Sequence, residues 1–359
     1  MTELWPGFSP TNHPVALFDG ERTWLFRHPS PPEEFRQASD AEGALVFDGR
    51  HPAVVGSSLV DLGGVTTATV LQGDRPDVQA EIAHETFHVF CRVRHPAWAA
   101  NEVSALTYPV EDPEVLTLRR LEAEALRRAV LEGAAGWAVV AASLRQDRFE
   151  RLPESAVRYE RDLERYEGLA FYVEGKWAGA IRCVEALATP SRPDDIRRAA
   201  YHTGEAMAVL LDKFAPGWAD ALEANDTLEL DGLLRAAVAG QASKEFSADE
   251  RAEVARSARE AVAAMETQRR LRREAFLARH GRIVLTALSP NAFEVAGYDP
   301  MNIEHLGRGE VLHTRFLKLR GEGVELEVFD SPALTESAGA HPLHDGIRRV
   351  TFTSMGDAS

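Results

Sequence analysis

The chain has 359 residues, of which 45% are hydrophobic and 27% charged, values typical of a soluble globular protein with two or three domains. A formal net charge of −16 argues against nucleic acid as a partner, because the phosphate backbone would be repelled. Two cysteines exclude a disulfide framework, and the absence of a signal-peptide pattern or a long apolar run predicts a cytoplasmic protein without a membrane partner.

Residues 1–75 have the pattern of antiparallel β-structure. Apolar runs on both sides of Asp19 and its following glycine predict a hairpin, and the same pattern around Asp48 predicts a second one. The β-branched segment 63–73 is expected to be the last strand of this sheet.

Residues 77–93 follow with apolar residues at helical spacing, and they contain the sequence His-Glu-Thr-Phe-His. A helix brings His84 and His88 to one face, about 6 Å apart, where both can bind one metal ion. Glu85 lies about 100° around the helix, beside the metal, where it can act as a general base. This is the zincin pattern, and the alternative is a half-exposed helix that carries two unrelated histidines.

Two neutral imidazole ligands suit catalytic Zn²⁺, which needs a third protein ligand. The next histidine, His95, is seven residues after His88 and does not fit the short-spaced patterns, so we expect a later carboxylate. Residues 113–234 are almost wholly helical by their periodicity, and within them the segment 165–175 reads Arg-Tyr-Glu-Gly-Leu-Ala-Phe-Tyr-Val-Glu-Gly.

This segment and the histidine motif together resemble the gluzincin zinc metallopeptidases, above all the zinc aminopeptidases and the peptidase-MA-like families. The resemblance covers about residues 60–225. It implies an α+β fold with a zincin-like catalytic domain, Zn²⁺ bound by His84, His88 and Glu167, and hydrolysis of peptide bonds. The aminopeptidases join their two motifs directly, whereas 78 residues separate His88 from Glu167 here, so residues 100–155 are expected to form a helical insertion.

The resemblance also bears on where a substrate would bind. Gluzincin metallopeptidases bind peptide along a sheet edge just before the motif helix, and the segment 63–73 has a similar place in this chain. The resemblance therefore implies that an extended peptide can bind along this segment.

A further match lies in the segment Ala-Tyr-His-Thr-Gly, whose tyrosine is 34 residues after Glu167. It resembles the segment in which these families carry the tyrosine that stabilises the oxyanion. The resemblance implies that role for Tyr201, with Gly204 at the matching glycine and His202 as the alternative donor. A buried tyrosine that only packs its ring is the other interpretation.

Three further glutamates share the helical stripe of Glu167. Glu160 and Glu164 are expected to form a solvated acidic face. Glu174 is expected to accept a hydrogen bond from a metal-binding histidine, as carboxylates near metal sites commonly do. The glycine after Glu167 is expected to let this helix approach the helix that carries the histidines.

The rest of the chain carries no further catalytic pattern. The helical core is expected over residues 76–245. A capping box predicts a connecting helix over 246–281. Short apolar runs then predict a small β-rich C-terminal domain over 282–359. The basic cluster at 268–282 has two interpretations, a stripe that binds a partner or a face that is solvated or docked on the acidic catalytic domain.

The sequence therefore predicts a zinc-dependent metallopeptidase that acts on a peptide substrate, with Glu85 as the base. The alternatives are a zinc hydrolase of another small amide and a non-catalytic binding or regulatory protein with a zincin fold. Glu85 argues against the last of these, because a structural metal site needs no base. The sequence does not indicate an oligomeric state.

Overall fold

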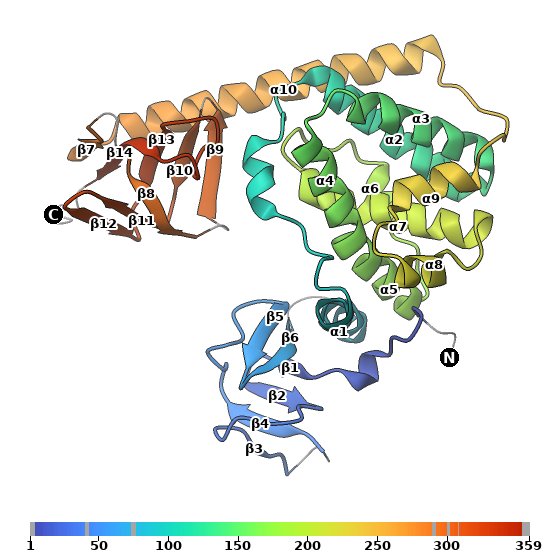
Figure 1. Ribbon diagram of the computed structural model, residues 1–359, viewed down its shortest axis with the longest axis horizontal. Coiled ribbons are helices and arrows are strands. Elements are labelled where there is room, and N and C mark those ends of the chain that lie inside the picture. The colour runs from blue at the N-terminus through green and yellow to red at the C-terminus, as the bar shows by residue number, and fades with distance from the viewer. Residues whose placement is uncertain are drawn as a thin grey trace. The chain divides into compact units, whose positions relative to one another are not determined.

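The computed structural model describes residues 4–39, 43–72, 77–288, 292–299, 302–307 and 309–353. It is an α+β structure with an N-terminal sheet, a helical middle part and a β-rich C-terminal part (Figure 1). The chain forms two compact units, an N-terminal unit of residues 1–101 and 114–254 and a C-terminal unit of residues 102–113 and 255–359. The division falls inside the connecting helix, and the first part of the expected insertion belongs to the C-terminal unit.

The N-terminal sheet has the strand order β3-β4-β2-β1-β6-β5. Its strands are β1 (Val15–Phe18), β2 (Arg22–Phe26), β3 (Arg36–Gln37), β4 (Leu45–Asp48), β5 (Ser58–Leu62) and β6 (Val65–Leu71). The hairpin at Asp19 is confirmed: the Asp19 carboxylate accepts hydrogen bonds from the backbone N–H groups of Glu21, in the turn, and of Arg22, the first residue of β2.

Two expectations for this sheet are wrong. The sheet is mixed, because β1 and β6 pair in parallel. No second hairpin follows Asp48, because the chain after β4 is irregular and is bound to the side chain of Thr23. The Thr23 hydroxyl donates to the Gly49 carbonyl and accepts a hydrogen bond from the His51 backbone N–H. Pro52 follows and has no N–H for a ladder, which also disfavours a strand there.

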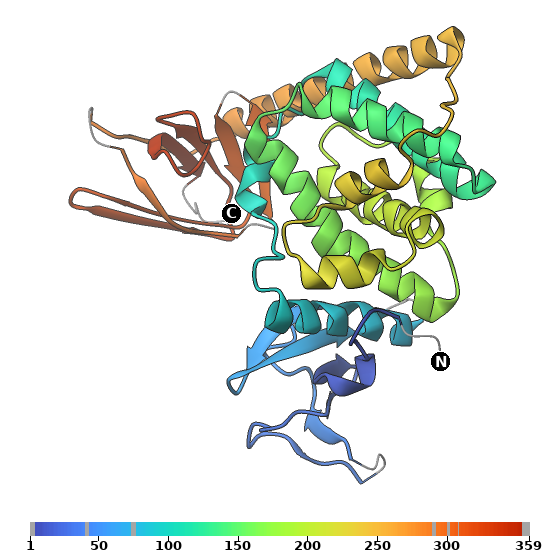
Figure 2. The ribbon, with the colours of Figure 1, turned by 45° about the vertical axis from the view of Figure 1, so that its right-hand side comes forward.

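Helix α1 (Val78–Arg94) confirms the predicted motif helix and lies between the sheet and the other helices of its unit (Figure 2). Asp77 caps its first turn by accepting hydrogen bonds from two backbone N–H groups. Ile82 and Val89 pack on β1 and β6, while Phe87 and Phe90 join the core of the helical part. This burial on both sides fixes the orientation of the histidines.

The helical part is built as predicted, with one irregular turn. Its elements are η2 (Glu102–Thr107), α2 (Pro113–Glu132), α3 (Ala135–Phe149), α4 (Glu154–Leu163), the π-helix η3 (Glu164–Gly168), α5 (Leu169–Ala178), α6 (Cys183–Leu187), α7 (Ile196–Phe214), α8 (Trp218–Ala224), α9 (Leu230–Ala237) and α10 (Ala248–Leu277). The capping box of α10 is confirmed by reciprocal hydrogen bonds between Ser247 and Glu250. Among the described residues, no helix combines the length and the apolarity that crossing a bilayer requires.

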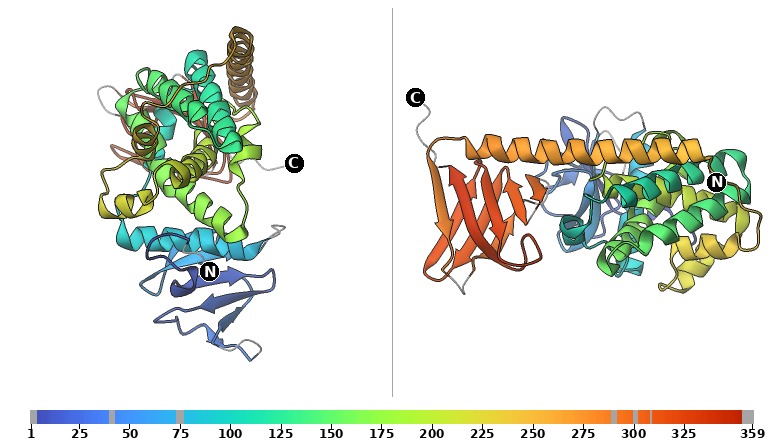
Figure 3. Two further views of the ribbon diagram at one scale, coloured as in Figure 1. Left: turned by 90° about the vertical axis from the view of Figure 1, so that its right-hand side faces the viewer. Right: turned by 90° about the horizontal axis from the view of Figure 1, so that it is seen from above.

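The C-terminal unit contains two sheets, with the orders β7-β14-β13-β10-β9 and β12-β11-β8. The strands are β7 (Arg282–Thr286), β8 (Glu294–Tyr298), β9 (Ile303–Gly307), β10 (Glu310–His313), β11 (Phe316–Gly321), β12 (Val324–Phe329), β13 (Ala333–Ser337) and β14 (Ile347–Thr353). The last turns of α10 cover one face of the five-stranded sheet (Figure 3). Phe276 packs there on Leu312 and Leu334.

Candidate metal centre

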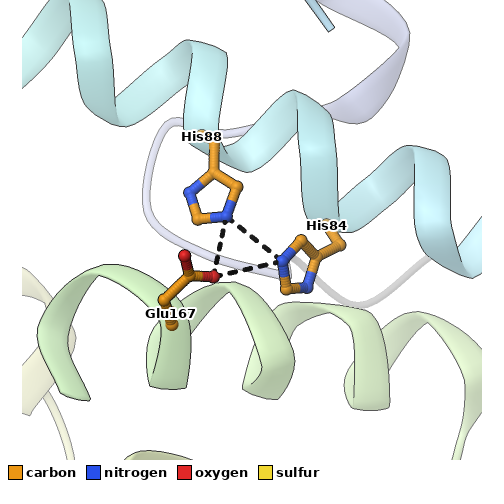
Figure 4. A group of neighbouring side chains, drawn as sticks. All are labelled: His84, His88 and Glu167. Carbon is orange, nitrogen blue, oxygen red and sulfur yellow. Dashed lines mark hydrogen bonds and ion pairs between the residues drawn. The ribbon is translucent and has the colours of Figure 1, made fainter. Parts of the chain in front are cut away.

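The histidines of the motif meet a glutamate from a distant part of the chain. His84 and His88 project from α1 toward Glu167, which lies on the π-helical turn η3 (Figure 4). All three residues are buried, with exposed fractions of 8%, 4% and 3%. The Nε2 atoms of the histidines and Oε2 of Glu167 form a group of donor atoms within 4.8 Å of one another.

The spacing of these donors fits a tetrahedral metal ion. The two Nε2 atoms are 3.1 Å apart, and Glu167 Oε2 lies 3.3 Å from His88 Nε2 and 3.7 Å from His84 Nε2. Metal–ligand distances of about 2.0–2.2 Å in a tetrahedral zinc site correspond to donor separations of about 3.3–3.6 Å. The described residues thus offer three protein donors at nearly the spacing that such a site requires.

The π-helical turn determines which glutamate faces α1. A π-turn holds more residues than an α-turn, so it changes the angular offset between Glu164 and Glu167. The sequence analysis expected Gly168 to allow a close approach to α1. Gly168 does allow close packing, but the helix that it approaches is α7. A Cβ on Gly168 would lie 2.6 Å from the Cα of Gly204, so the two helices meet backbone to backbone. Glycine at both positions lets η3 and α7 approach closely beside Glu167.

Glu174 has the expected position next to His84. The Nδ1–H of His84 donates to Glu174 Oε2 over 3.0 Å, so Nε2 is the ring nitrogen that would bind a metal. Arg182 donates to the other Glu174 oxygen over 2.6 Å and stacks on Phe171. His88 is held differently, because its ring stacks on Tyr166 with the centroids 4.1 Å apart.

Arg182 and Arg197 are functional candidates that the sequence analysis missed. Arg197, on α7, donates to Glu167 Oε1 and so leaves Oε2 as the atom that faces the histidines. A signal for Arg197 existed, because it precedes Tyr201 by four residues and therefore shares its helix face. Arg182 lies in a loop before α6, where no sequence periodicity indicates the direction of a side chain.

The charges of the site are strongly coupled when no metal is bound. Burial lowers the pKa of His84, but its contacts with Glu167, Glu174 and Glu85 outweigh burial and raise it to about 10. Burial and the neighbouring charge of His84 lower the pKa of His88. Burial also disfavours a charged Glu167, yet hydrogen bonds from both histidines hold its pKa well below the usual value. At neutral pH the metal-free site therefore holds one extra proton, which is on the His84 ring.

We expect metal binding to release about one proton per site at pH 7.5, because a ligating imidazole must be neutral. With the pKa of His84 at about 10, the apparent affinity should rise with pH through the neutral range instead of levelling off above the ordinary value of 6.5. Calorimetric titration with zinc in buffers of different ionisation enthalpy measures the number of released protons. No proton release at pH 7.5 would show that both rings are already neutral.

Of the three remaining predicted residues, Glu85 and Tyr201 lie next to the metal group, whereas His202 lies beside Phe171. Glu85 is 8% exposed, and its charge acts on His84. The ring of Tyr201 stacks on that of His84 with the centroids 6.1 Å apart, and burial followed by contact with Glu167 raises the pKa of its hydroxyl. His202 packs on Phe171, and burial lowers its pKa to about 4. Tyr201 is therefore the nearer of the two candidate donors.

The expected acidic face at Glu160 and Glu164 is wrong, because both residues are buried. Glu164 accepts two hydrogen bonds of 2.6 Å from Arg145, and Glu160 accepts one of 2.5 Å from Arg148. Glu122, on α2, pairs with both arginines. The network neutralises these charges inside the helical part.

A comparison of the chain with family models, with curated proteins and with solved structures found no match.

Proposed function

We propose that the protein is a zinc-dependent metallopeptidase of the gluzincin type, with a zincin-like fold in its N-terminal unit. The observation that supports this most strongly is the group formed by His84, His88 and Glu167, whose donor spacing suits a tetrahedral ion. Two imidazoles and one carboxylate are a ligand set of catalytic zinc sites that keep a fourth position open.

The side chains around this group support a hydrolytic role. When bound, the metal would act as a Lewis acid that polarises a carbonyl oxygen and makes water more acidic. Glu85 takes a proton from the attacking water and passes it to the leaving amine. The hydroxyl of Tyr201 donates a hydrogen bond to the oxygen that becomes negatively charged. Arg197 keeps one Glu167 oxygen engaged, so that the carboxylate acts through the other.

A peptide substrate needs an extended surface close to these groups. The expected strand, β6, is unsuitable because it is paired on both sides, with β1 and with β5. Strand β5 is the edge of the sheet and contacts α1. We propose that the substrate pairs its main chain with β5, which gives affinity with little dependence on sequence.

Metal analysis of the purified protein, combined with a peptide-library cleavage assay, tests the proposal. We expect one zinc ion per chain, loss of cleavage after chelation, and recovery when zinc is restored. His84→Ala should lose both metal and activity, whereas His341→Ala, in a turn of the C-terminal unit, should keep both. A fully metallated His84→Ala protein would disprove the metal assignment. Metal binding without cleavage of peptides or of small amides would favour a regulatory protein.

A further inference from the structure

The basic segment 268–282 consists of two parts with different surroundings. In the first part, Arg269, Arg272 and Arg273 each pair with a glutamate of the C-terminal unit. Arg272 and Arg273 remain about half exposed, which agrees with the solvated helix face that was one interpretation of the sequence. In the second part, Arg279 and Arg282 are exposed, and no acidic side chain among the described residues pairs with either. These two cations lie at the end of α10 and the start of β7.

A groove lies between the last turns of α10 and the sheet, with a volume of about 440 Å³. Four arginines line it together with one glutamate: Arg273, Arg279, Arg282, Arg349 and Glu336. Leucine and valine side chains from α10, β7 and β13 add apolar surface. Arg273 pairs with Glu310 and Arg349 pairs with Glu336, so within the described residues the net positive charge of the groove comes from Arg279 and Arg282, in a chain whose net charge is −16.

Strand β7 borders the groove and, among the described strands, lies at the edge of its sheet and pairs with β14. Its apolar side chains are unusually open, with Ile283 41% and Val284 54% exposed. The backbone N–H of Ala287 donates to the carbonyl of Arg348 on β14, so Ala287 points its backbone polar groups toward that strand. Successive residues of a strand point these groups to opposite sides. Arg282, Val284 and Thr286 therefore direct theirs away from β14.

We infer that β7 and the groove bind an extended acidic segment of a partner protein, which adds a strand to the sheet. Main-chain pairing along β7 supplies affinity, and the side chains of the added strand supply specificity. Acidic residues at alternate positions fall on the face of Arg282 and Val284, beside the groove. Apolar residues between them fall on the face of Ile283 and Leu285, which continues the core between the two sheets. The partner segment thus alternates acidic and apolar residues.

Charge argues against a second copy of this chain as the occupant. Antiparallel pairing of two β7 strands around Val284 would place Arg282 of each copy opposite Thr286 of the other. Strand β7 contains no acidic residue, so this pairing would offer Arg279 and Arg282 no attraction. An acidic segment instead gains attraction at each of them.

Binding of a fluorescent acetylated peptide in which glutamate and valine alternate tests the inference on the full chain. Fluorescence anisotropy should show saturable binding that weakens with salt, and a peptide with lysine for glutamate should not bind. Val284→Pro removes the outward N–H at an edge where proline is tolerated, and should weaken binding at least tenfold. Val284→Thr keeps the N–H and should bind like the wild type. Equal binding by these two variants would overturn strand addition.

Two further measurements keep the inference open to disproof even if the proline variant is unstable. Hydrogen exchange of the wild-type chain should slow at the amides of Arg282, Val284 and Thr286 when the peptide is added. Arg279→Glu should weaken binding about tenfold, whereas Arg256→Glu, an exposed position earlier on α10, should not. Absence of amide protection, or equal binding by the two charge variants, would overturn the proposal. Dimerisation through β7 in sedimentation experiments would also overturn it, in favour of a second copy.

Discussion

The Glu85→Gln variant is expected to keep the fold and the metal but to lose hydrolysis by about 10²–10⁴-fold, the usual contribution of a general base. Glutamine has nearly the same shape as glutamate and cannot accept a proton. Glu85 is outside the group of three metal donors, so the exchange leaves those donors in place. Turnover of a peptide found in the library assay, measured together with metal content and thermal stability, separates the chemical effect from a structural one.

Glu81→Gln is the matched control for this variant. Glu81 is also a buried glutamate of α1, one turn earlier, and it accepts a hydrogen bond from Ser57. We expect turnover close to that of the wild type, with at most a small change in stability. If Glu85→Gln cleaves peptides as fast as Glu81→Gln, then Glu85 is not the base.

The sequence was most informative where the interactions are local. The motif helix was predicted at 77–93 and runs over Val78–Arg94, because its apolar spacing and its Asp77 cap act within a few residues. The i, i+4 rule then correctly placed His84 and His88 on one face. Glu167 was found by a motif rather than by periodicity, which cannot distinguish it from other glutamates on its stripe.

The sequence was least informative where the partners are distant in the chain. The spacing of Glu160 and Glu164 in the sequence is the same whether they face solvent or pair with buried arginines. The fold decides between the two, because it brings Arg145 and Arg148 of α3 next to them. The parallel pairing of β1 and β6 likewise joins two strands that are far apart in the sequence, because β2 to β5 lie between them along the chain. The π-helical turn has no periodicity of its own that a sequence reveals, although it decides which glutamate faces the metal site.

Glu167→Ala is expected to lose zinc binding and Glu164→Ala to lose stability, although the two residues are only three positions apart. Glu167→Ala should abolish stoichiometric zinc binding, because it removes one of three protein donors. Its effect on folding should be the smaller of the two, since its other partner, Arg197, is about half exposed and can be solvated.

Glu164→Ala should leave the zinc donors intact but destabilise the chain by about 3 kcal/mol, the lower end of the range for breaking a buried ion pair. Arg145 loses two hydrogen bonds in the protein interior, and Glu122 remains to compensate only in part. Urea denaturation in the presence of a chelator measures the stability, and competition with a chromophoric chelator measures the zinc affinity. Glu154→Ala, at the exposed start of α4, the helix that leads into η3, is the control and should change neither. A large loss of zinc affinity in Glu164→Ala with none in Glu167→Ala would mean that the π-helical turn presents a different glutamate to α1.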